Sequence, residues 1–148
     1  MANREKVPRH AVEPAVKKMP RHHYPAEGES AELISWRIGD VELEGPWGWG
    51  TIPPEKARLI HGFLSALEKL TWGIACHEGK PVRQVKVKDA PAEARKRLEE
   101  TGRDDVESLT ELHFGGLSRI WGVRRGSACH LLWWDPEHKV WPSPKRRT

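Results

Sequence analysis

Apolar residues recur at helical spacing in the first half of the chain. After Pro54 the apolar positions follow one another at intervals of three and four residues as far as about Leu70. This spacing places them on one face of a helix. A second helix is predicted over residues 90–101, where the apolar stripe is limited to Ala94 and Leu98. We expect that helix to lie on the surface and to pack along one narrow face.

Alternating apolar and polar residues predict strands elsewhere. The segments LISWRI and VELE flank Gly39 and Asp40, a pair typical of a β-hairpin turn. Valines alternate with lysines over residues 82–88, which predicts a short extended segment. Further strands are expected over residues 109–114, 117–124, 128–134 and 139–141. The predicted fold class is α+β: an N-terminal hairpin, two helices, then a three- to four-stranded antiparallel sheet.

The composition changes near residue 31. Residues 1–30 contain four prolines among mostly polar residues, which predicts a flexible basic N-terminal arm. Residues 31–142 are expected to form a single α+β domain, and residues 143–148 a basic C-terminal tail. A chain of 148 residues has the usual length of one domain.

The net charge of +4 is concentrated at the two ends, because the residues between them are nearly neutral. Basic ends favour contact with nucleic acid, although short charged termini are often only solvated. Two cysteines are too few for a secreted disulfide framework, and the chain contains neither an export signal nor a membrane-spanning apolar stretch. We therefore expect a cytoplasmic protein with no membrane contact.

No metal or other cofactor is expected. Cys76-His77 and Cys129-His130 lack the spacing of structural zinc ligands, and no P-loop, dinucleotide fingerprint or HExxH motif occurs.

The segment RIWGVRRGSACHLLWWDPEHKVWP, which begins at Arg119, contains most of the candidate chemistry. On its first strand Arg119 shares a face with Trp121 and Val123, and on the next strand His130 shares a face with Leu132 and Trp134. Antiparallel pairing is then expected to bring Arg119 and His130 together.

The residues DPEH have the signature of a tight turn in which Asp135 caps its own backbone. The alternative interpretation is that the turn presents Glu137 and His138 beside a basic strand face. Imidazole and carboxylate groups near guanidinium groups suit acid–base cleavage of a phosphodiester, with Arg119 or Arg124 stabilising the charge that develops on phosphate.

Eight tryptophans are far above ordinary usage for this length. Most are expected in the core, and Trp133 and Trp134 must point to opposite faces of their strand. One of these two could be exposed and stack on an unpaired base. A covering helix or a partner protein would explain the same residue equally well.

The order of helix, helix and antiparallel strands, with an arginine-bearing strand followed by a hydrophobic strand and a polar, aromatic end, resembles the RelE/ParE toxin superfamily. The resemblance covers about Pro54 to Trp141, and the last segment also looks like the end of small toxin-like bacterial and phage proteins. It implies a metal-independent endoribonuclease that cuts messenger RNA on the ribosome and that an antitoxin protein neutralises.

The resemblance also implies roles for particular residues. It implies Arg119 and Arg124 as phosphate contacts, His138 as the acid–base residue, and Lys86, Lys88 and Arg95 as RNA contacts. The residues themselves add Glu137 as a further catalytic candidate and Arg125, Lys139 and Trp134 as further candidate RNA contacts. The competing interpretation is a non-enzymatic module that binds a protein or a nucleic acid with a Trp-rich sheet face.

Overall fold

The computed structural model describes residues 31–77 and 80–142. They contain one five-stranded sheet in the order β1-β5-β4-β3-β2. The strands are β1 (Ser35–Arg37), β2 (Val82–Lys86), β3 (Ser108–Gly115), β4 (Ser118–Arg125) and β5 (Ala128–Asp135). Neighbouring strands from β2 to β5 are antiparallel, whereas β1 runs parallel to β5. The α+β class predicted from the sequence is confirmed, but the predicted three- to four-stranded antiparallel sheet is wrong, since the sheet has five strands and one parallel pair.

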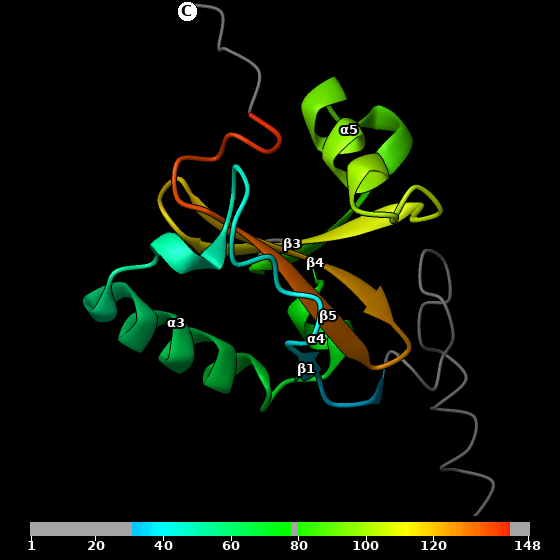
Figure 1. The fold of residues 1–148 in the computed structure, drawn as a ribbon. Helices are drawn as coiled ribbons and strands as arrows, with labels where there is room; N and C mark the ends of the chain where they lie inside the picture. Colours follow the sequence, from blue (N-terminus) through cyan, green and yellow to red (C-terminus); the bar gives the residue numbers. More distant parts are fainter. Residues whose placement is uncertain (1–30, 78–79, 143–148) are drawn as a thin grey trace, which may run out of the picture.

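Helices cover both faces of this sheet (Figure 1). The helices are α3 (Pro54–Leu67), α4 (Trp72–Ala75) and α5 (Ala92–Glu100), with short 3-10 turns at Trp49–Thr51 and Val87–Asp89. Figure 1 shows α3 and α4 on one side of the sheet and α5 on the other. Among residues 31–77 and 80–142, no helix is both long and apolar enough to cross a membrane.

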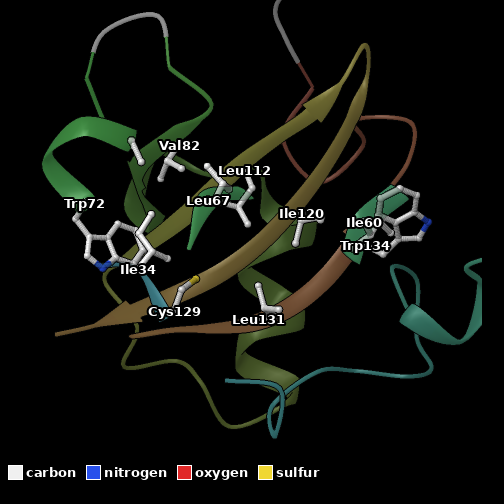
Figure 2. Packing of buried hydrophobic residues seen from close by; sticks show 11 residues of the cluster. Ile34, Ile60, Leu67, Trp72, Val82, Leu112, Ile120, Cys129, Leu131 and Trp134 are labelled. Atoms are coloured by element: carbon white, nitrogen blue, oxygen red, sulfur yellow. The ribbon is translucent and has the colours of Figure 1, made fainter. Parts of the chain in front are cut away.

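Each face of the sheet has its own hydrophobic core. The α3-side core contains Ile60 and Leu67 of α3 and the fully buried Trp72 of α4, packed against Leu112 and Ile120 of the sheet (Figure 2). The α5-side core joins both predicted apolar residues of α5 to a group of sheet and loop residues that includes three tryptophans. They are Ala94, Leu98, Trp47, Trp121 and Trp133.

The predicted N-terminal hairpin does not form. Instead, β1 pairs in parallel with β5, from Ser35 opposite Ala128 to Arg37 opposite His130. The chain after Gly39–Asp40 follows a loop in which the Glu42 N–H donates to the carbonyl of Leu132. Packing favours this arrangement because Trp36 of β1 lies against the α3-side core and its indole N–H donates to Leu64 of α3.

The strand predicted over residues 139–141 is also absent, since these residues follow a tight turn that leaves the sheet. The expected arm (1–30) and tail (143–148) lie outside the described residues.

An irregularity in the pairing of β4 with β5 determines the face of the sheet on which the tryptophans of β5 lie. Trp121 lies opposite Trp133, but the next residue of β4, Gly122, lies opposite Leu131, so β5 contains one extra residue. Trp133 therefore packs in the α5-side core and Trp134 in the α3-side core. The two do point to opposite faces, as predicted, but both are buried, at 0% and 3% exposure. The predicted common face of Leu132 and Trp134 is wrong, because Leu132 packs in the α5-side core.

Candidate active site

A buried carboxylate forms the centre of a charged cluster on the α5 side of the sheet. Glu111 of β3 has a side chain that is only 6% exposed. Arg83 of β2, its direct cross-strand partner, approaches one carboxylate oxygen to 2.7 Å. Arg119 of β4 donates from Nε to the other oxygen at 3.1 Å. Two guanidinium groups thus flank one carboxylate. A buried carboxylate needs such oppositely charged, hydrogen-bonding partners to offset the cost of leaving water.

The imidazole of His138 completes this group, hereafter the Glu111 cluster (Arg83, Glu111, Arg119 and His138). Its Nε2 lies 3.5 Å from the same Glu111 oxygen that Arg119 contacts. The side chain is 8% exposed. Burial, reinforced by the positive charge of Arg119, holds the pKa of His138 below its ordinary value, while Glu111 and Asp135 act in the opposite direction. His138 is therefore neutral near pH 7 and able to accept a proton.

Asp135 holds His138 in position through the backbone of the turn. Its carboxylate accepts the N–H groups of Lys139 and Val140 at 2.8 and 2.9 Å and the indole N–H of Trp121 at 3.2 Å. His138 itself has a φ of 59°, in the left-handed region that non-glycine residues seldom adopt. The turn is thus the self-capped turn predicted from DPEH, and it also presents His138 to Arg119.

The expected convergence of Arg119 with His138 is present, but through Glu111, which the sequence analysis did not single out. Arg83 was missed in the same way. The available signal was a Glu among apolar residues on a strand flanked by arginine-bearing strands, since a carboxylate in such a position needs cationic partners. This signal does not identify the partners, because they depend on the register of both strand pairs.

Other predicted members of the site lie elsewhere. Arg119 is opposite Asp135, and His130 is opposite Val123, four residues further along β4, or about 13 Å away at strand spacing. The expected pairing of Arg119 with His130 is therefore wrong. His130 instead contacts Asp40 at 3.1 Å.

Two residues predicted to be catalytic are not part of the Glu111 cluster. Arg124 lies five positions beyond Arg119 on β4, where its guanidinium carbon is 4.2 Å from the ring centre of Trp72, in the α3-side core. Glu137 points into solvent with its side chain 67% exposed and pairs with the equally exposed Lys139 at 3.1 Å. The carboxylate of the cluster is that of Glu111, and Glu137 lies outside it.

The residues predicted to contact RNA do not form one surface around the cluster. Lys86 and Lys88 are exposed at the opposite end of β2 from Arg83. Arg95 on α5 lines a shallow hollow with Arg103 and Glu99. Arg125 is exposed at the β4–β5 turn, again away from the cluster, whereas Lys139 is exposed next to His138.

Trp134 cannot stack on a base, because it is buried. Of the eight tryptophans, all of which belong to the described part of the chain, every one is buried or half-buried. The expected exposure of Trp133 or Trp134 is therefore wrong; most of the tryptophans fill the two cores, and Trp36, Trp49 and Trp141 are half-buried.

Comparison with known proteins gave no further information on the site, since no family model, no curated protein and no solved structure matches the chain. Within residues 31–77 and 80–142, no three His, Cys, Asp or Glu side chains are grouped so that they could hold a metal ion.

Proposed function

We propose that this protein is a ribonuclease that cleaves RNA by metal-independent acid–base chemistry at the Glu111 cluster. One observation carries the proposal: a carboxylate, an imidazole and two guanidinium groups converge on one face of the sheet. The side chain of Arg83 is 69% exposed, so a ligand can reach the cluster from the side of Arg83, whereas Glu111, Arg119 and His138 are 6%, 12% and 8% exposed. Glu111 and the neighbouring Asp135 balance the charges of the two arginines, so the guanidinium donors rather than a net charge are what suit a phosphate.

Each member of the cluster has a role in this reaction. His138 accepts the proton of the ribose 2′-hydroxyl, and the 2′-oxygen attacks the adjacent phosphorus as the bond to the 5′-oxygen breaks. Arg83 and Arg119 face the phosphate and stabilise the charge that develops on its oxygens. Glu111 positions both arginines and the imidazole. The products are a 2′,3′-cyclic phosphate and a 5′-hydroxyl end.

The wider proposal follows the resemblance described above: a RelE-like toxin that cuts messenger RNA and that an antitoxin protein neutralises. Its support is the order of elements, with two main helices preceding three consecutive antiparallel strands, and a cluster to which β3, β4 and the turn after β5 contribute Glu111, Arg119 and His138. Of the phosphate contacts and the acid–base residue named by the resemblance, Arg119 and His138 are members of the cluster, whereas Arg124 is not.

The test uses the full chain and a labelled single-stranded RNA in the presence of EDTA. His138→Asn is the preferred variant because asparagine tolerates a positive φ but cannot accept the proton at neutral pH. Glu111→Gln removes the central charge with little change in volume. Glu137→Gln is the matched control, since this glutamate belongs to the same turn but points into solvent.

We expect the wild type and Glu137→Gln to cleave RNA equally, and His138→Asn and Glu111→Gln to lose activity by roughly 10²- to 10⁴-fold. Circular dichroism and the urea midpoint of each variant identify any loss that is due to unfolding. Equal cleavage by folded His138→Asn and by Glu137→Gln would contradict the proposal.

A further inference from the structure

A second histidine lies beside the Glu111 cluster. His113 follows Glu111 by two residues on β3, so both side chains project from the same face of the sheet. Its direct cross-strand partner on β4 is Arg119. Side chains opposite one another in this way have Cβ atoms about 5 Å apart. His113 is exposed to solvent, in contrast to His138.

The cleavage reaction requires two proton transfers. One proton leaves the attacking 2′-hydroxyl, and another must reach the 5′-oxygen as its bond to phosphorus breaks, because an alkoxide is a poor leaving group in water. His138 is buried, neutral and in contact with Glu111, which suits it to accept the first proton. It does not at the same time hold a proton to donate.

Arg119 is the common neighbour of the two imidazoles. It shares a Glu111 oxygen with His138 and lies directly across the strand pair from His113. A phosphate that binds the guanidinium of Arg119 therefore has an imidazole available from β3 and another from the turn after β5. Two separate imidazoles next to one phosphate site are what the two proton transfers need.

We propose that His113 is a catalytic residue, the general acid that protonates the leaving 5′-oxygen. This inference rests on the proposed ribonuclease function. His113 enters the step as an imidazolium and gives one N–H proton to the 5′-oxygen while the P–O bond breaks. His138 gains the proton of the 2′-hydroxyl in the same step, and exchange with water restores both side chains.

The test compares two substrates that differ only in the leaving group. One is a single-stranded RNA oligonucleotide, and the other carries sulfur in place of the bridging 5′-oxygen at one linkage. A thiolate leaves without protonation, so general acid catalysis is needed only for the first substrate. The variants are His113→Gln and His138→Asn, and the control is His61→Gln, an exposed histidine of α3 on the opposite side of the sheet.

We expect His113→Gln to lower kcat/KM on the ordinary RNA by roughly 10²- to 10⁴-fold and to cleave the sulfur linkage at nearly the wild-type rate. His138→Asn should lose activity on both substrates. His113→Gln with the same activity as His61→Gln on ordinary RNA would overturn the inference while leaving the proposed ribonuclease intact. An equal loss on both substrates would also overturn it, since it would show that His113 does not protonate the leaving group. A wild type that cleaves neither substrate would refute the proposed function and this inference together.

Discussion

The turn that carries His138 depends on Asp135, and the structure indicates how much the free energy of unfolding falls when this side chain is removed. Only 1% of Asp135 is exposed, and its carboxylate accepts three hydrogen bonds. In Asp135→Ala, the buried donors Trp121 Nε1 and Val140 N lose their acceptor, whereas the N–H of Lys139 is nearer to solvent. Each buried donor left without a partner costs about 1–3 kcal/mol. We expect Asp135→Ala to lower the free energy of unfolding by about 4 kcal/mol.

Asp135→Asn provides a graded comparison. One amide oxygen can still accept two of the three hydrogen bonds, but the amide NH₂ group then faces the third donor and the charge is lost. We expect a loss of about 2 kcal/mol for this variant. Asp105→Ala, which alters an exposed aspartate in the connection between α5 and β3, is the control and should remain close to wild type.

Urea unfolding followed by tryptophan fluorescence and by far-UV circular dichroism measures these differences. With a slope of about 2 kcal/mol/M, a loss of 4 kcal/mol moves the midpoint by about 2 M. Asp135→Ala within about 1 kcal/mol of Asp105→Ala would refute the account of the turn.

Three further predictions concern Gly122, the titration of His138 and the reactivity of the two cysteines. A methyl group at Gly122 would lie 2.6 Å from a carbonyl oxygen of β5, so Gly122→Ala should lower the free energy of unfolding by about 1–3 kcal/mol. The control Gly62→Ala, which has open space around it in α3, should raise the free energy of unfolding slightly. Equal urea midpoints for the two variants would contradict this prediction. The pKa of His138 in the folded protein lies below its ordinary value of 6.5, so at a pH between these two values the unfolded chain binds more protons than the folded chain. The free energy of unfolding of the wild type should therefore fall as the pH drops through this range. In denaturation series from pH 7.5 to 5, His138→Asn should show a shallower fall than the wild type. Burial raises the pKa of Cys129 to about 12 and also raises that of the half-buried Cys76, so iodoacetamide at pH 8 should label Cys76 first, as mass spectrometry of the digested protein can determine.

The elements with a strong local signal were predictable. The helix that begins at Pro54 has a proline-rich start and a regular apolar stripe. The strands β3, β4 and β5 are separated by two short turns, each of which contains a glycine. The pairing of β1 with β5 was not predictable, because it joins segments about 90 residues apart for which local turn chemistry gives no information.

The composition of the site depended on register. Near the β3–β4 turn, Gly115 is opposite Ser118 but His113 is opposite Arg119, so the pairing shifts by one residue between them. A regular hairpin would have placed Arg119 opposite Phe114, on the α3 side of the sheet. A one-residue shift moves a side chain to the other face, and this shift brings Arg119 to Glu111. The extra residue in β5 likewise changes the face on which Trp133 and Trp134 lie relative to His130.

The most direct test of the central claim compares a single-stranded RNA oligonucleotide with its all-2′-deoxy counterpart, each incubated with the wild-type chain in EDTA. If the Glu111 cluster cleaves RNA as proposed, the RNA is cut to fragments that end in a 2′,3′-cyclic phosphate, which mass spectrometry detects, and the deoxy strand remains intact. Intact RNA, or equal cleavage of both strands, would contradict the account.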